Sequence, residues 1–408
     1  MEEHLGTVFV EIRASLVGSL YHLRYVPSMN SPDHQGPKVL FAASMVSMVL
    51  GSIHAFSVFL EPLETTFKSS RGTVSLIYSF SLVFLTISVL FGPAVYSRLQ
   101  PATIYIWVAF LGAIGTGLAG IATGLETVWI GYSFIFGIAN GLGYGFGLQF
   151  AARANPDHAG FAMGVVTAAY ALGAVLAPYG FEVALAYGGF FLAMIALGSV
   201  IFFVALGAAL IVLRSGAQYS DAQAKPKTFN LPLGRIAAIW VAYGSGVAAG
   251  LMAIGHAAGI AATAGFAGWV ATAVIAGCNL VGSLLSGWLS EKVSHRRILT
   301  VLPLLGTAAL LALSVFPGLT IALLGVVGFA YGGTIATYPA AISVLFPGED
   351  GPIAYGRIFT AWGLAGLLAP WLAGQIYDWD GSYVLALWVA AGLGIISAIS
   401  AQKSMRHS

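Results

Sequence analysis

Continuous apolar runs of about twenty residues recur along this chain and are separated by short polar stretches. A helix needs about 20 residues to cross the hydrocarbon core of a bilayer, so each run is long enough to span a membrane. The apolar residues do not alternate with period two, which indicates helices and not the strands of a membrane barrel. We therefore expect twelve transmembrane helices, over Val39–Leu60, Thr73–Tyr96, Thr103–Thr123, Val128–Ala151, Gly160–Phe181, Gly189–Val212, Ile236–Gly259, Gly268–Leu289, Leu299–Phe316, Thr320–Leu345, Ile353–Ile376 and Ser382–Ile399.

The composition excludes several classes of protein. Of the 408 residues, 58% are hydrophobic and only 8% are charged, whereas a soluble protein carries about 25% charged residues. A net charge of +2 gives no basic surface for nucleic acid. The single cysteine, Cys278, excludes an internal disulfide and a cysteine-rich metal site. No Walker, HExxH or GxSxG motif occurs, so we expect no enzyme activity and no cofactor.

Basic residues gather on one side of the predicted membrane plane. If both termini share a side, fifteen of the 17 lysines and arginines fall there, and only Lys68 and Arg71 fall on the other side. Cytoplasmic loops carry the excess of basic residues in membrane proteins. We therefore expect a multi-pass protein of the inner (plasma) membrane with both termini in the cytoplasm, and we expect it to be a monomer.

Two polar segments suggest how the chain divides. Within residues 1–37, the weakly apolar stretch Gly6–Tyr25 is too polar to span a membrane, so we expect a disordered cytoplasmic segment or a start at Met29; an amphipathic surface helix is the alternative. Residues 213–235 hold two prolines and four basic residues, which is typical of a cytoplasmic linker. The expected units are an N-terminal segment (1–37), a six-helix bundle (38–212), the linker (213–235), a second six-helix bundle (236–400) and a cytoplasmic tail (401–408).

The sequence repeats itself at an offset of about 192 residues. Gly164–Pro178 resembles Gly356–Pro370, and Tyr187–Met194 matches Asp380–Leu387 shortly afterwards. These segments belong to the fifth and sixth and to the eleventh and twelfth predicted helices, so the repeat keeps its direction. The sequence therefore predicts an all-α integral membrane fold of two parallel-repeat bundles. Transporters with this layout bind their solute between the halves.

The loop after the eighth predicted helix carries a family signature. It reads Gly287-Trp-Leu-Ser-Glu-Lys-Val-Ser-His-Arg-Arg297 and resembles the G-x-L-(A/S)-D/E-R/K-x-G-R-R/K motif of the major facilitator superfamily. The equivalent loop after the second helix, Gly92–Arg98, lacks the acid. The resemblance implies gating roles for Arg98, Glu291, Lys292 and Arg297. Ordinary positively charged loop residues are the alternative interpretation.

Within the superfamily, three stretches resemble the oxalate/formate antiporter and monocarboxylate transporter group. They are Gly51–Arg71, Asn279–Gly282 and Phe359–Gly363. The resemblance implies transport of a small organic acid, as a symporter or an antiporter. Ser283 stands where that group usually has an arginine, and Trp362 stands where some members have a lysine. Because a buried carboxylate without a counter-charge costs several kcal/mol, we do not expect oxalate as the substrate.

Two histidines, His54 and His256, lie inside predicted spans that occupy equivalent places in the two halves. Ionisable residues inside a membrane are costly and mark functional sites, and a histidine can carry a proton near physiological pH. A neutral histidine bonded to a backbone carbonyl is the alternative. The full set of predicted substrate-binding residues is His54, Tyr78, Asn140, Tyr144, Tyr170, His256, Asn279, Ser283, Tyr331 and Trp362.

These features together predict a secondary transporter that moves a small solute by alternating access, with proton coupling or exchange. A monocarboxylate-like organic acid is the expected solute. A neutral or amphipathic solute, such as a siderophore-like compound or a drug, is the first alternative. A membrane sensor or assembly factor that transports nothing is the second.

Overall fold

The computed structural model describes residues 32–219, 233–290, 292–346 and 350–405, and within these ranges it contains helices and no strand. Part of the expected N-terminal segment, residues 1–31, and part of the expected linker lie outside these ranges. The first half contains α2 (Pro32–Leu50), η1 (Gly51–Phe59), α3 (Leu60–Phe67), α4 (Arg71–Tyr96), α5 (Pro101–Gly120), α6 (Leu125–Val128), η2 (Trp129–Phe136), α7 (Gly137–Ala154), η3 (Pro156–His158) and α8 (Ala159–Ser215). The second half contains α9 (Leu233–Gly255), α10 (Ala257–Thr263), α11 (Gly268–Leu289), α12 (His295–Leu313), η4 (Pro317–Leu319), α13 (Thr320–Leu345), α14 (Asp350–Asp380) and α15 (Val384–Ser404).

The helices account for the twelve predicted spans. Among the described residues, nine helices are long and apolar enough to cross a membrane. One of them, Phe161–Ser215, holds two spans, because the backbone leaves the helical region at Gly188 and Gly189. The consecutive helices α6, η2 and α7 form the fourth predicted span, and α14 forms the eleventh.

The first span is longer and less regular than predicted. It begins at Pro32, tightens to a 3₁₀-helix in η1, and continues through α3 to Phe67. The acidic residues Glu61 and Glu64 are therefore helical instead of lying in a loop. A stretch of 3₁₀-helix inside a longer helix often marks a functional hinge.

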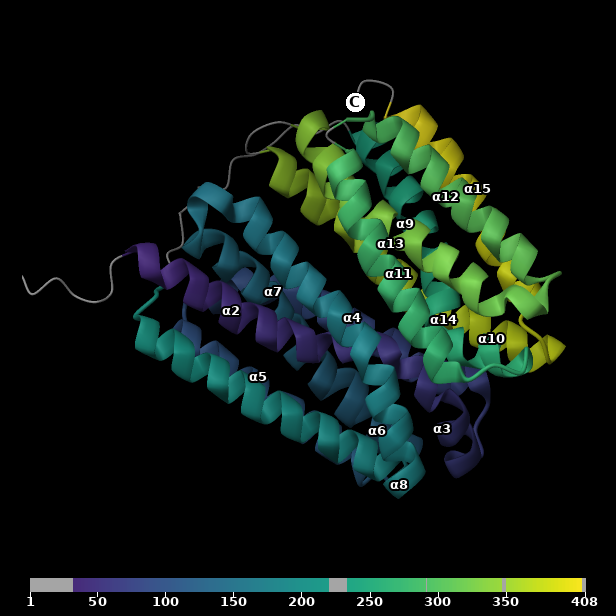
Figure 1. Ribbon diagram of the computed structural model, residues 1–408, viewed down its shortest axis with the longest axis horizontal. Helices are drawn as coiled ribbons and strands as arrows, with labels where there is room; N and C mark the ends of the chain where they lie inside the picture. Colours follow the sequence, from purple (N-terminus) through teal and green to yellow (C-terminus); the bar gives the residue numbers. More distant parts are fainter. Residues whose placement is uncertain (1–31, 220–232, 291, 347–349, 406–408) are drawn as a thin grey trace, which may run out of the picture.

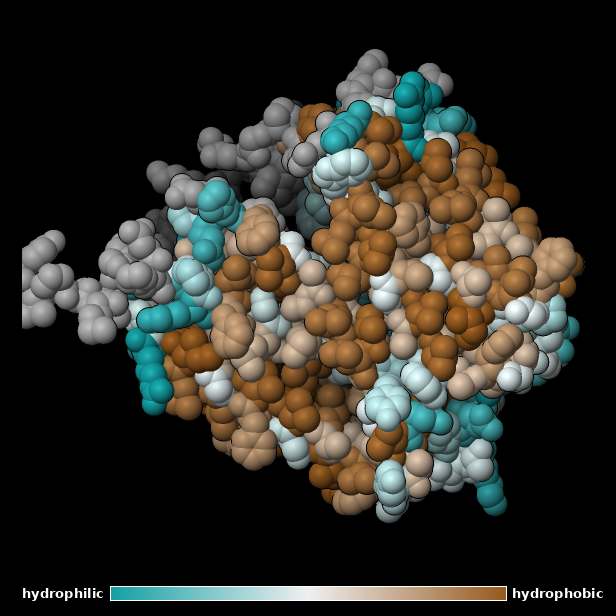
Figure 2. Space-filling view, in the orientation of Figure 1, coloured by the Kyte–Doolittle hydropathy of each residue, from teal (hydrophilic) through white to brown (hydrophobic). Residues whose placement is uncertain are grey.

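The spans form two bundles, drawn from purple to teal and from green to yellow in Figure 1. The bundles meet mainly where α4 packs on α14 and where α8 packs on α11. Figure 2 shows a broad hydrophobic belt with hydrophilic residues toward the ends of the molecule, which is the surface that a lipid bilayer requires. Large apolar side chains of the spans are exposed, among them Phe203 at 71% and Trp388 at 56%.

Two glycines bring α4 and α14 together at one end of the interface. A Cβ atom on Gly374 would lie 2.8 Å from the Cα atom of Gly72 and 2.8 Å from the Ser75 hydroxyl oxygen. Small residues allow helix backbones in membranes to approach this closely. We call this end, where α4 begins and α14 finishes, the Arg71 end.

We predict that Gly374→Ala lowers the melting temperature of the purified protein, because overpacking a tight contact costs about 1–3 kcal/mol. Gly392→Ala in α15 is the matched control, since its Cβ would meet nothing within 4 Å. The control should be neutral or stabilising by up to about 1 kcal/mol, the helical advantage of alanine over glycine. Equal melting temperatures for the two variants would contradict the close α4–α14 contact.

Candidate functional site

A narrow cavity lies between the two bundles. It is lined by His54 from η1, Ala174 from α8, Ile254 from α9, Thr272, Ile275, Ala276 and Asn279 from α11, and Tyr331 from α13. Its free space of about 20 Å³ is enough for a water-sized molecule. Both halves contribute side chains, so a change in their relative position would change the shape of this cavity. We call it the central cavity.

His54 presents a hydrogen-bonding imidazole to the central cavity. Its Nδ1 lies 2.7 Å from the hydroxyl oxygen of Tyr78 on α4. The ring of Tyr170 on α8 meets the imidazole edge-on, with ring centroids 5.6 Å apart. His54 is half-buried whereas Tyr78 is fully buried, so the pair connects the cavity surface to the interior of the first bundle.

A buried amide fixes the part of the first span that carries His54. The side-chain nitrogen of Asn140 donates to the carbonyl of Leu50 at 2.7 Å, and the Tyr170 hydroxyl donates to the Asn140 side-chain oxygen at 3.0 Å. Leu50 is the last residue of α2, directly before the 3₁₀-helix η1 that carries His54. Asn140 therefore supports the irregular backbone that directs His54 into the cavity. The ring of Tyr144, another predicted site residue, packs on Tyr170 with centroids 4.4 Å apart.

Polar and aromatic side chains form the opposite wall of the cavity. The Ser283 hydroxyl donates weakly to the Asn279 side-chain oxygen at 3.4 Å. The Trp362 indole nitrogen donates to the Tyr331 hydroxyl at 3.1 Å, and Phe359 stacks on Trp362 with an interplanar angle of 5°. The indole thus holds Tyr331 in place at the cavity wall.

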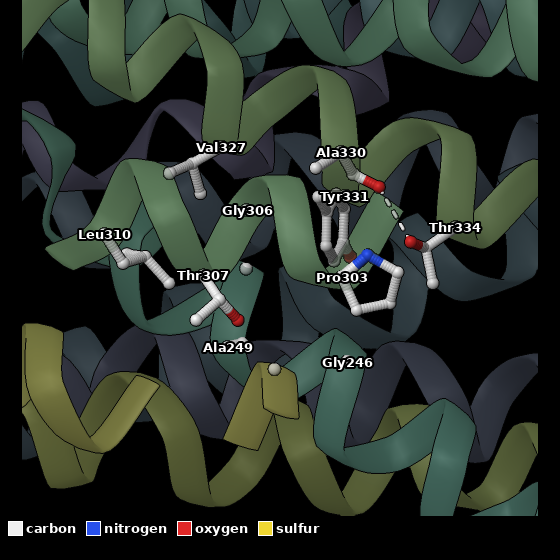
Figure 3. A pocket seen from close by; sticks show the side chains of 12 residues that line it. Gly246, Ala249, Pro303, Gly306, Thr307, Leu310, Val327, Ala330, Tyr331 and Thr334 are labelled. Atoms are coloured by element: carbon white, nitrogen blue, oxygen red, sulfur yellow. Dashed lines mark hydrogen bonds between the residues drawn. The ribbon is translucent and has the colours of Figure 1, made fainter. Parts of the chain in front are cut away.

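Tyr331 also borders a second cavity, shown in Figure 3, which lies inside the second bundle. Glycines, alanines and two threonines supply most of its lining. Both threonines are already bonded: Thr334 donates to the Ala330 carbonyl at 2.7 Å and Thr307 to the Ala391 carbonyl at 3.2 Å. The second cavity therefore offers little polar chemistry, and the Tyr331 ring is the wall that it shares with the central cavity.

His256, the other predicted histidine, does not line the central cavity. It is fully buried where α9 gives way to α10. Its Nε2 lies 2.8 Å from the Pro370 carbonyl oxygen of α14 and 3.3 Å from the Ser75 hydroxyl of α4. Its Nδ1 lies 3.2 Å from the Tyr383 hydroxyl. The structure therefore separates the two histidines, which the sequence assigned to one site.

Charged residues surround His256 at the Arg71 end. The Arg71 guanidinium donates to the Glu64 carboxylate at 2.7 Å and to the Tyr383 hydroxyl at 2.7 Å, and it lies 4.3 Å from the centroid of the Tyr377 ring. Asp378 accepts hydrogen bonds from the first two backbone N–H groups of α4, at 2.9 and 2.7 Å. The Arg71–Tyr383 and Asp378 bonds cross between the halves, whereas the Arg71–Glu64 bond lies within the first half. We call Glu64, Arg71, His256, Asp378 and Tyr383 the Arg71 cluster.

Sequence reasoning missed most of this cluster. The second predicted span begins at Thr73, which leaves Arg71 in a loop, where it is one of only two basic residues on the predicted outer side and follows Glu61 and Glu64. That isolation was the available signal, because a lone cation among carboxylates is a good candidate for an ion pair.

The predicted gating residues are placed only in part. Arg98 and Arg297 are exposed, and the Lys292 ammonium lies 3.8 Å from the centroid of the Trp288 ring. Glu291 lies outside the described residues. Their role in gating stays a prediction.

Comparison with known proteins supports the fold from two directions. The sequence model of the Major Facilitator Superfamily matches residues 233–403, which is the second half. The uncharacterized MFS-type transporter YhjX of Escherichia coli is 33% identical over 96 residues, or 23% of this chain and 24% of YhjX. The match thus spans about a quarter of the length of that relative.

Solved structures resemble nearly the whole chain. The inward-open xylose transporter XylE of E. coli has a TM-score of 0.70 at 14% identity, with 88% of this chain and 94% of that chain covered. A bacterial homologue of the human lysosomal transporter Spinster, inward-facing and unoccupied, has a TM-score of 0.68 at 17% identity and covers 91% and 93%. A D-xylose–proton symporter has a TM-score of 0.71 at 15% identity and covers 90% and 97%. The predicted major facilitator fold is therefore confirmed.

We predict that Tyr170→Phe destabilises the protein by about 1–3 kcal/mol, because it removes the donor to a fully buried amide oxygen of Asn140. Tyr179→Phe, on the same helix but 60% exposed, is the matched control and should stay within about 0.5 kcal/mol of the parent. Melting curves of the two purified variants make the comparison. If Tyr170→Phe melts with the control, the amide does not depend on this hydroxyl.

Proposed function

We propose that the protein is a member of the major facilitator superfamily and a secondary active transporter that moves a small monocarboxylate-like acid together with a proton. One observation carries this proposal: both halves of a major facilitator fold line one cavity. Among its described lining residues, His54 is the side chain that can gain or lose a proton near neutral pH. Such halves rock around a central site in transporters of this layout.

The interface between the halves supports alternating access. Apart from α4–α14 and α8–α11, the contacts between halves are small, and several are single hydrogen bonds, such as Ser57 to Thr272 at 2.9 Å. If the basic loops face the cytoplasm, the Arg71 end faces outward, and the Arg71 cluster closes that end of the cavity. Two of the similar structures are inward-facing or inward-open, which agrees with closure at the outer end.

The lining chemistry supports an acid that travels with a proton. No lysine or arginine is among the lining residues that the structure describes, and a bare carboxylate in such a site costs several kcal/mol. Protonation of His54 would supply the missing positive charge. The side-chain amide of Asn279 would then supply a further hydrogen bond.

A neutral or amphipathic solute is the second candidate. It is favoured by Ser283 and Trp362, which stand where members of the resembled group have an arginine or a lysine. Trp362 is committed to Tyr331, and Ser283 offers a hydroxyl that is only weakly bonded. Neither substitution restores a charge. The remaining lining, Ala174, Ile254, Ile275 and Ala276, is apolar.

Thermal stabilisation of the detergent-purified protein separates the two candidates. A ligand at about 100 times its dissociation constant stabilises the folded state by about 2.7 kcal/mol. We predict that small monocarboxylates raise the melting temperature, and that they do so more at pH 5.5 than at pH 7.5, because protonated His54 binds the carboxylate. Stabilisation by neutral or bulky solutes alone would replace the acid with the second candidate.

We predict that His54→Gln abolishes proton-driven accumulation of the acid in proteoliposomes and leaves solute exchange intact, since glutamine keeps hydrogen-bonding groups but carries no proton. His158→Gln, at an exposed position, is the control and should accumulate solute like the parent. Unchanged accumulation in His54→Gln would remove His54 from the coupling mechanism. Absence of both activities in the parent would favour a non-transporting sensor or assembly factor.

A further inference from the structure

The hydrogen bonds of His256 define its protonation state in the closed cluster. The Pro370 carbonyl can only accept a hydrogen bond, so Nε2 must carry a hydrogen. The Ser75 hydroxyl donates to the Arg71 carbonyl at 2.7 Å and can therefore only accept from this same Nε2. Nδ1 is left without a hydrogen and accepts from the Tyr383 hydroxyl. The closed Arg71 end thus fits a neutral imidazole.

A second proton on His256 would conflict with the closed arrangement. It would place an N–H group against the Tyr383 oxygen, which already accepts from the Arg71 guanidinium. Two cations would then converge on one hydroxyl in a site where His256 has no exposure to water. The hydrogen bond from Tyr383 to Nδ1 would be lost as well.

The neighbouring carboxylates are already engaged. Glu64 is paired with Arg71, and Asp378 accepts from two backbone N–H groups at the start of α4. Neither is bonded to His256, whose own partners are Ser75 on α4, Pro370 on α14 and Tyr383 next to α15. Of the charged groups at this end, Arg71 is the one that shares a hydrogen-bond partner with His256.

Separation of the halves would remove this conflict. Glu64, Arg71 and Ser75 belong to the first half, whereas His256, Pro370, Asp378 and Tyr383 belong to the second. When the Arg71 end opens, Arg71 moves away and water reaches the imidazole. The open form therefore binds a proton more tightly, and by linkage the proton favours the open form.

We propose that His256 is a proton-binding site distinct from the central cavity, and that a proton bound there opens the Arg71 end of the interface. The ligand is a hydrogen ion delivered from the water on that side. This site acts on the conformational equilibrium, so the proposal holds whichever solute the central cavity takes.

Spin labels on either side of the interface test this directly. The labels replace Glu61 and Trp379, which are exposed on α3 and α14, in a Cys278→Ser background. We predict that lowering the pH from 8 to 5, with no solute present, raises the open-to-closed ratio at least about fivefold, the low end of ordinary coupling between sites. Pulsed electron paramagnetic resonance measures the two distance populations.

Two substitutions assign the response to His256. His256→Gln retains an N–H donor and a carbonyl acceptor but does not titrate, so its distance distribution should not change with pH. His54→Gln should respond like the parent, which separates this site from the proposed transport mechanism. His256→Asn replaces the glutamine variant if that variant does not purify as a folded monodisperse protein. A parent without a pH response, or a response that survives in the non-titrating variant, would overturn the proposal.

Discussion

A guanidinium that is nearly removed from water holds the two halves together at one end of the molecule. The Arg71 side chain is only 9% exposed, and its cost of burial is offset by Glu64 in its own half and by Tyr377 and Tyr383 in the other. Removing one partner of a buried ion pair costs about 3–5 kcal/mol, because the remaining charge stays uncompensated. That ion pair lies within the first half and holds Arg71 in place to donate across the interface to Tyr383, while small residues and single hydrogen bonds build other parts of the interface. Such an interface suits the alternating movement proposed for the two halves.

The central cavity is organised by the same need to satisfy buried polar groups. In the first half, Asn140 and Tyr170 bond to each other and Asn140 donates to the Leu50 carbonyl, where the first span tightens. In the second half, Trp362 restrains Tyr331. Each half thus contributes one rigid wall, and the polar groups that remain open to a solute lie between the walls. A movement of one wall against the other would change the shape of the cavity and would not require either bundle to repack.

The sequence predicts the architecture better than the connections within it. Hydropathy depends on each segment's own composition, so the spans could be read correctly, and the repeat between Gly164–Pro178 and Gly356–Pro370 indicated two parallel bundles. His54, Asn279 and Tyr331 do line the cavity. The Arg71 cluster could not be derived, because helix periodicity does not say which residue 312 positions away will meet Arg71. The 3₁₀ segment was also unforeseen, since hydropathy does not distinguish it from an α-helix and Asn140, which bonds to the backbone there, lies 90 residues away.

The cap on α4 has a consequence for the order in which the molecule is made. Asp378, which receives the first two N–H groups of α4, lies 307 residues after Arg71. Ser70 caps only the N–H of Thr73 in the meantime. During synthesis the second span therefore enters the membrane before Asp378 can accept from the N–H groups of Arg71 and Gly72. These two hydrogen bonds form only when the eleventh span has been added. Assembly of the first bundle is thus finished by the second, and almost the whole chain has been synthesised before the first half reaches its final form.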